Sequence, residues 1–97
     1  MATGGEARDY AGETLERLQQ SGIVVNPRFA STLEQFILNG FNRSVREGAS
    51  QERFEAAWEQ LIQGIFAYVG ETGNDVLTAK VFTSIRRQIC PGFWPFC

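Results

Sequence analysis

The 97-residue sequence contains no histidine and only two cysteines. Without histidine the chain has no Ser-His or Cys-His nucleophile pair, lacks the most common general base, and cannot form the usual zinc ligand sets. Six residues separate the two cysteines, and without other soft ligands this pair makes a poor metal site. A glycine-rich phosphate-binding loop is missing as well. These absences predict a protein that is not an enzyme and binds no metal or other cofactor.

Long apolar runs and an excess of basic residues are also absent. No stretch reaches the roughly 18 apolar residues that a membrane span requires. Residues 1–13 have neither the basic region nor the apolar run of a secretory signal. The net charge is −2 and the isoelectric point is near 5.1, which is unfavourable for binding nucleic acid. We therefore expect a cytoplasmic protein with no nucleic-acid partner.

Glutamates at one-turn spacing are the remaining candidates for acid–base or metal chemistry. Glu52, Glu55 and Glu59 lie three and four residues apart. Dimetal sites in helical bundles require Glu-x-x-His motifs, which this sequence cannot form. The three glutamates also lie off the face that carries Phe54 and Trp58. We interpret them as a solvated helix surface.

Residues 7–89 have the apolar periodicity of an all-α bundle of three to four helices, preceded by a disordered segment at residues 1–6. The first helix is expected over residues 7–20, where the apolar stripe is thin. Three β-branched residues follow before a proline. Because one three-residue run cannot form a sheet alone, we interpret residues 23–25 as an extended connector packed on the bundle.

The second helix is predicted to run from Asn26-Pro27 to about residue 47. An asparagine followed by proline is a typical helix start. Asn39-Gly40 interrupts the segment and could divide it into two helices. Since the apolar face resumes in phase beyond this dipeptide, we predict one continuous helix. The residues of that face are Phe29, Leu33, Phe36, Ile37, Phe41 and Val45.

Ser50 is the predicted start of the third helix, since serine is a favoured N-cap residue. The segment from Phe54 to Val69 has the broadest apolar face in the chain, which makes this the central helix. A short first helix would cover that face incompletely, so a homodimer remains open.

The fourth helix is expected to begin near Gly73 or Asn74. Thr72 and Asp75 have the spacing of a capping box, in which the side chains at the two ends of the first turn satisfy backbone N–H groups. On this interpretation Val76 and Leu77 are the first apolar positions of the helix.

Residues 90–97, with the sequence CPGFWPFC, form a separate tail that no helical periodicity covers. Pro91 and Pro95 exclude a helix there. The bends that they introduce bring Cys90 and Cys97 within reach of a disulfide, which would stabilise the protein by about 2–3 kcal/mol on the chain-entropy estimate. In a reducing compartment the pair would remain as thiols, and a short-loop pair can also act as a redox switch.

Four interpretations of the tail remain open. Phe93, Trp94 and Phe96 could fold back as a lid over the open end of the bundle. They could instead form an exposed recognition element that enters a pocket of a partner protein. A third possibility is a membrane surface, with the adjacent arginines at anionic headgroups and the aromatics at the interface. In the fourth, residues 1–88 are a recognition domain for enzymes that process the cysteine-bounded segment as the product of a precursor peptide.

We expect a non-enzymatic binding or regulatory protein, such as an adaptor, that acts through protein–protein contacts. The predicted contact residues are Arg86, Arg87, Phe93, Trp94 and Phe96. A precursor peptide and a peripheral membrane-surface protein are the alternatives. The expectation rests on one idea: aromatic residues within the helices are used for internal packing, which leaves the tail free to contact a partner.

Overall fold

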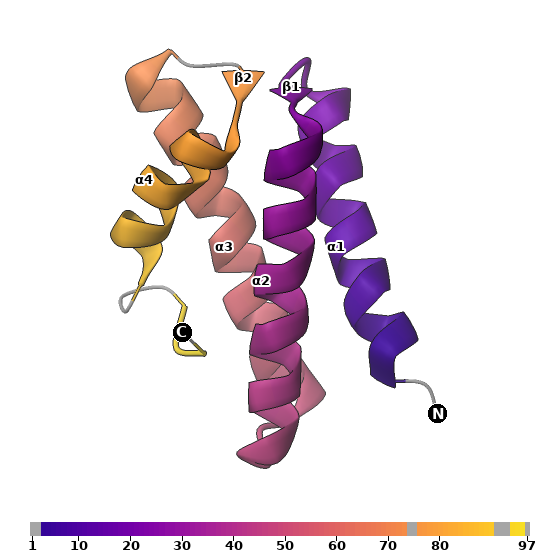
Figure 1. Cartoon of the computed structure of the whole chain (residues 1–97). Helices are drawn as coiled ribbons and strands as arrows, with labels where there is room; N and C mark the ends of the chain where they lie inside the picture. Colours follow the sequence, from indigo (N-terminus) through magenta and orange to yellow (C-terminus); the bar gives the residue numbers. More distant parts are fainter. Residues whose placement is uncertain (1–2, 74–75, 91–93, 97) are drawn as a thin grey trace.

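The computed structural model describes residues 3–73, 76–90 and 94–96, with side chains from Glu6 onward. These residues form four helices and two short strands, which confirms the predicted all-α bundle. Figure 1 shows α2 between α1 and α4, with α3 behind them. The elements are α1 (Thr3–Gln20), β1 (Val24–Val25), α2 (Pro27–Arg46), α3 (Gln51–Thr72), β2 (Val76–Leu77) and α4 (Ala79–Ile89).

Helix α1 begins at Thr3, four residues before the predicted helix start at residue 7. Its buried stripe consists mainly of small side chains, including Ala7, Ala11 and Thr14. Small residues allow α1 to pack closely against the neighbouring helices. Thr14 is wholly buried, and its hydroxyl is satisfied by donating to the Tyr10 carbonyl at 2.7 Å. The thin stripe seen in the sequence is therefore sufficient to bury one face of this helix.

Helix α2 is continuous, as predicted. The Asn26 side chain accepts a hydrogen bond from the Arg28 backbone N–H, and Pro27 occupies the first helical position. The helix passes through Asn39-Gly40 without a break and places Gly40 on its buried face. Ser50 caps α3 in the same way, by accepting from the Arg53 backbone N–H. Both helix starts could be predicted because the capping side chains are local in sequence.

The predicted start of the fourth helix near Gly73 is wrong. Helix α3 continues to Thr72 and ends at Gly73, whose φ of 66° is the left-handed conformation that favours glycine at a helix C-terminus. Helix α4 begins only at Ala79, where Thr78 is the cap and its hydroxyl accepts from the Val81 backbone N–H.

The residues before α4 form a strand. Val76 pairs with Val24 and Leu77 with Val25 in a parallel two-stranded sheet at one end of the bundle (Figure 1). The segment interpreted as an extended connector is thus one strand of this pair. Because its partner is about half the chain away in sequence, no local pattern could reveal the pairing.

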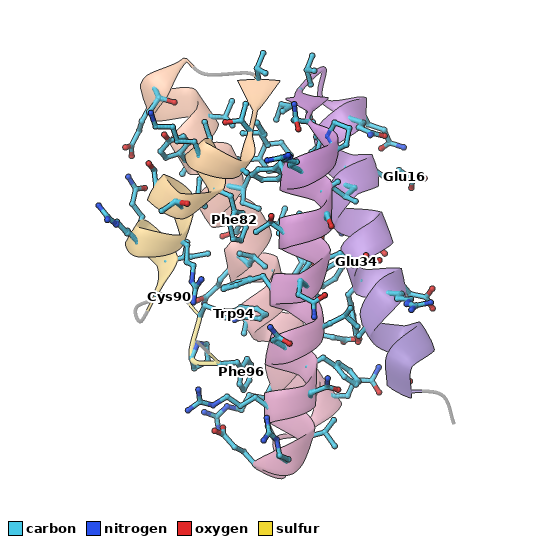
Figure 2. All side chains as sticks on the ribbon, viewed as in Figure 1. Glu16, Glu34, Phe82, Cys90, Trp94 and Phe96 are labelled. Carbon is cyan, nitrogen blue, oxygen red and sulfur yellow. The ribbon has the colours of Figure 1, made fainter. Side chains whose placement is uncertain are left out.

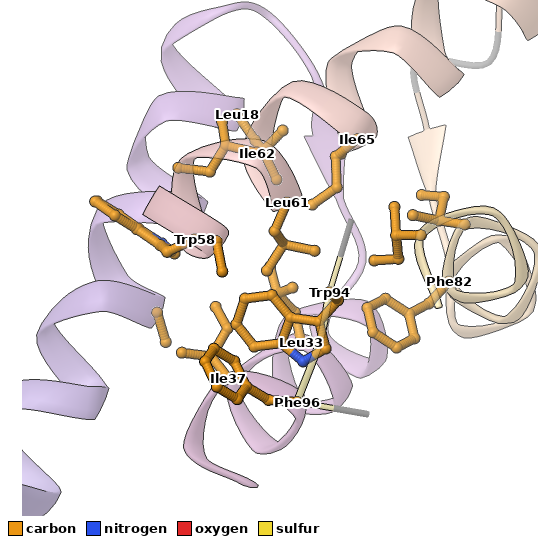
Figure 3. Packing of buried hydrophobic residues seen from close by; sticks show 14 of the residues in the cluster. Leu18, Leu33, Ile37, Trp58, Leu61, Ile62, Ile65, Phe82, Trp94 and Phe96 are labelled. Atoms are coloured by element: carbon orange, nitrogen blue, oxygen red, sulfur yellow. The ribbon is translucent and has the colours of Figure 1, made fainter. Parts of the chain in front are cut away.

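The hydrophobic core runs along the bundle and includes residues of the tail (Figure 3). Aliphatic side chains of α3, such as Leu61, Ile62 and Ile65, pack beside Leu18 of α1. Toward the tail the core becomes aromatic, and the rings form a connected series. Its members include Phe29, Phe36, Phe41, Phe54, Phe82, Trp94 and Phe96. Within the described ranges, no helix combines the length and apolar character needed to cross a membrane.

Candidate functional site

The Trp94–Phe96 segment lies against α2, just beyond the end of α4 (Figure 2). Helix α4 has 11 residues whereas α2 has 20 and α3 has 22, so α4 covers only part of its neighbours. The segment occupies the remaining space. Trp94 is 0% exposed and Phe96 is 4% exposed. The Trp94 backbone N–H donates to the Ile89 carbonyl at 3.0 Å, which joins the segment to the last turn of α4.

The Trp94 indole is surrounded by aromatic rings. Its centroid lies 5.3 Å from that of Phe36, 5.8 Å from that of Phe54 and 5.5 Å from that of Phe96. The indole also lies directly on Gly40 of α2: a Cβ atom at that position would be 3.0 Å from Cε2 of Trp94 and closer still to Cζ2. Glycine at position 40 therefore provides the space that the indole occupies.

The two tryptophans differ in how their N–H groups are satisfied. Nε1 of Trp58 donates to the buried Thr14 hydroxyl at 2.8 Å. Nε1 of Trp94 is buried without a hydrogen-bond partner in the part of the chain that the structure describes. An unsatisfied buried donor costs about 1–3 kcal/mol. Shape and ring contacts, and not side-chain hydrogen bonds, thus hold the Trp94 indole in place.

A surface hollow of about 230 Å³ lies beside this segment, between α2 and α4. We call it the α2–α4 hollow. Its aromatic residues come from α2, α4 and the tail, its amides from α2 and its one cation from α4. The lining residues are Thr32, Gln35, Phe36, Asn39, Phe82, Arg86 and Phe96.

Among the residues that the structure describes, Arg86 is the only charged group in the lining of the hollow. Its guanidinium carbon lies 5.8 Å from the centroid of the Phe36 ring, in cation–π geometry. Arg86 makes no ion pair within the described residues, whereas Arg17 and Arg43 pair with glutamates. The hollow thus combines an aromatic surface with an exposed cation that has no carboxylate partner there.

The charged residues are segregated by helix. Helices α2 and α4 together carry six cations and one carboxylate, a formal charge of +5, whereas α1 and α3 carry eight carboxylates and three arginines, a formal charge of −5. Because α2 packs against α4, the positive charge is carried by two neighbouring helices, although Arg43 pairs with Glu47, which directly follows α2. The carboxylate on α2 is Glu34, which lies toward α1 (Figure 2). The basic residues are Arg28, Arg43, Arg46, Lys80, Arg86 and Arg87.

The residues predicted as the contact element are not brought to the surface together. Arg86 and Arg87 are exposed on α4, but Trp94 and Phe96 belong to the core. The expectation of an exposed aromatic tail is corrected accordingly: these two side chains fill the space that the short α4 leaves open, as the lid interpretation requires. Phe93 lies outside the described residues.

Phe36 and Gly40 were not among the predicted site residues. Phe36 is one of the in-phase core residues of α2, yet it also lines the hollow. The only local signal was glycine in the middle of an otherwise continuous helix, because such a residue often permits the close approach of another group.

A second polar cluster joins α1 to α3. Tyr10 donates from its hydroxyl to Glu55 at 2.8 Å, and Gln51 donates to the same carboxylate at 3.2 Å. Burial raises the pKa of Tyr10 above its usual 10.0, and the hydrogen bond to Glu55 adds to this effect. Arg17 reaches Glu59 at 3.3 Å. Glu55 and Glu59 are therefore bonded across helices and half-buried, so the solvated-surface prediction holds only for the exposed Glu52.

Comparison with protein-family models, curated proteins and solved structures found no match to this chain.

Proposed function

We propose that this protein is a non-enzymatic helical binding protein that acts through protein–protein contacts, and that the α2–α4 hollow is its contact surface. The observation that carries the proposal is the Arg86 guanidinium, which lies exposed on the Phe36 ring without a carboxylate partner in the described structure. Arginine and aromatic side chains are enriched where protein interfaces gain most of their binding energy.

The tail contributes to this surface from within the fold. Phe96 lines the hollow, and Trp94 packs against the same Phe36 ring that Arg86 covers. Removal of the Trp94 indole would therefore disturb the hollow without deleting any of its lining residues. In this proposal the tail shapes the contact surface, and Arg86 contacts the partner directly.

The proposal is tested by photo-crosslinking in the source cells. A photoreactive residue replaces Gln35, which is exposed and lines the hollow. The control carries the same residue at Gln63, which is exposed and lines a different hollow on α3. A protein adduct formed from position 35 and not from position 63 supports the proposal. Identical adducts from both positions, or none from position 35, would contradict it.

We also propose that Cys90 and Cys97 form a disulfide that closes the tail into a ring. Cys90 is not a free thiol in the described part of the chain, and Cys97 is the only other cysteine in the sequence, although it lies outside the described residues. A ring of this size would restrict the tail to conformations near its packed position. Intact mass of protein from the native source, with and without reductant, tests it: reduction should add two hydrogen atoms.

The precursor-peptide and membrane-surface alternatives face the same structural obstacle. Enzymes that process the tail, or a bilayer that binds it, would have to remove Trp94 and Phe96 from the core first. A mass change confined to residues 90–97 of native protein that persists after reduction would favour a precursor. Sedimentation with anionic vesicles that is lost in the double substitution Arg86→Ala and Arg87→Ala would favour a membrane surface.

A further inference from the structure

We propose that the α2–α4 hollow binds an acidic segment of a partner protein, which places one aromatic side chain against the exposed part of Phe36 and a neighbouring carboxylate on Arg86. This inference rests on the proposed function, and it adds the chemistry of the partner.

The size and surface of the hollow favour a single large apolar side chain. Its volume of about 230 Å³ is below the roughly 300–1,000 Å³ of typical small-molecule sites. The rings of Phe36 and Phe82 meet edge to face, with centroids 5.5 Å apart and planes at 76°. Phe82 is 2% exposed, and the half-buried Phe36 ring is already in contact with Arg86 and Trp94. An incoming ring would therefore meet the part of Phe36 that remains exposed, in a tilted or edge-to-face arrangement of the kind that aromatic pairs prefer.

The Arg86 guanidinium favours a partner that carries an anionic group next to its aromatic side chain. Its guanidinium lies over Phe36 and makes no ion pair in the described structure. A planar guanidinium can stay stacked on a ring while its N–H edge binds both oxygens of a carboxylate. The amides of Gln35 and Asn39 in the same lining can donate to and accept from the backbone of a bound segment.

The surrounding charges favour an acidic partner over longer distances. On α2, Arg28 lies one helical turn before Thr32 and therefore extends the face that lines the hollow. Arg87 follows Arg86, and α4 contains no carboxylate. The formal charge of α2 and α4 together is +5, and it is +4 when Glu47, which follows α2 and pairs with Arg43, is included. These two helices would therefore attract an acidic segment and accelerate its association.

A second copy of the chain fits less well than a separate acidic partner. Of the eight carboxylates on α1 and α3, three are already engaged within the protein, and no aromatic side chain of these two helices is exposed for insertion into the hollow. Glu13 and Glu59 pair with Arg17, and Glu55 accepts from Tyr10. Docking onto the hollow of another copy would have to compete with these contacts.

Fluorescence anisotropy with the full chain tests the inference. The probe is a fluorescein-labelled peptide with one phenylalanine flanked by glutamates, and the two comparison peptides carry lysine for glutamate or alanine for phenylalanine. We expect only the first peptide to bind, with an affinity that falls as salt is added. Arg86→Gln should weaken its binding about tenfold or more, because the charge-assisted pair is lost.

Matched variants separate the contact from general charge effects. Arg53→Gln removes an exposed arginine on α3 and should change the affinity less than about twofold. Arg86→Lys keeps the charge but not the planar fork and should bind with intermediate affinity. Circular dichroism of each variant verifies that the helices are intact.

The inference is overturned if the acidic peptide does not bind, if Arg86→Gln binds it as well as the wild type, or if the lysine peptide binds equally. Salt-sensitive self-association that Arg86→Gln abolishes would assign the hollow to a second copy and would also overturn it. A protein adduct at position 35, obtained without any binding of the acidic peptide, would overturn this inference and leave the proposed function standing.

Discussion

Gly40 and Trp94 are in direct contact, and this contact joins the middle of α2 to the last residues of the chain. The space above the Gly40 Cα is occupied by the indole, so a Cβ atom there would lie 3.0 Å from Cε2 and 3.2 Å from Nε1 of Trp94. Glycine within a helix costs about 1 kcal/mol relative to alanine. The sequence carries that cost because the indole could not otherwise be buried.

Alanine in place of Gly40 should therefore lower the stability of the protein, whereas alanine in place of a glycine with open space around it should raise the stability. Gly40→Ala is expected to lower the free energy of unfolding by about 1–3 kcal/mol, because overpacking exceeds the gain in helix propensity. Gly12→Ala, at an exposed helical position with no atom within 4 Å of the added Cβ, should raise it by up to about 1 kcal/mol. Urea denaturation measures both; equal stabilisation by the two substitutions would refute the close contact.

The buried hydrogen bond between Thr14 and Trp58 gives a second test. Thr14→Val preserves the size of the side chain but leaves Nε1 of Trp58 without its acceptor. We expect a loss of about 1–3 kcal/mol in the free energy of unfolding. Thr83→Val, at an exposed position on α4, is the control and should change it by less than about 0.5 kcal/mol. A Thr14→Val protein as stable as this control would mean that the bond contributes nothing.

The environment of Tyr10 predicts a high-pH effect. Burial and the hydrogen bond to Glu55 raise the pKa of Tyr10 in the folded state above 10.0. The resulting stabilisation is present below pH 10 and is lost as the pH rises through the folded-state pKa. In Tyr68→Phe, where Tyr10 is the only tyrosine, ultraviolet titration of the folded protein should give a midpoint above 10. A midpoint at or below 10 is incompatible with this environment.

The position of the α4 start can be tested through its cap. Thr78 accepts from the Val81 backbone N–H, so Thr78→Ala should destabilise the protein by about 1 kcal/mol. The reference variant is Thr32→Ala. Thr32 is exposed within α2 and caps no helix, so its loss shows how much the removal of a threonine alone changes the stability. If both substitutions have the same effect in thermal denaturation, Thr78 does not cap α4.

The parts of the fold that depend on neighbouring residues could be predicted from the sequence. The cap at Asn26, the cap at Ser50 and the continuous apolar face of α2 each follow from residues within a few positions of one another. The bundle follows from the same periodicity, because helices with one apolar face must bury it against each other. The prediction for the start of the fourth helix was wrong because it used only the local capping-box pattern at Thr72. In the structure Gly73 ends α3 instead, and the residues that follow pair as a strand with a distant segment.

The candidate site could not be predicted because it depends on which segments become neighbours. The burial of Trp94 results from the short α4, which leaves a space that the tail fills. Two helices of net positive charge become neighbours because α2 packs against α4, although the acidic α3 separates them in sequence. Along the chain these cations are dispersed, with only Arg86 and Arg87 adjacent.

The most direct measurement is a double-mutant cycle between Gly40 and Trp94, read as free energies of unfolding in urea. Trp94→Ala alone should cost about 3–5 kcal/mol, and Trp94→Leu, which keeps an apolar side chain, serves if the alanine variant does not fold. With the indole removed, Gly40→Ala should change from destabilising to stabilising by up to about 1 kcal/mol, so that the two sites are strongly coupled. If Gly40→Ala has the same effect with and without the indole, Trp94 does not lie on Gly40, and the tail is not part of the core.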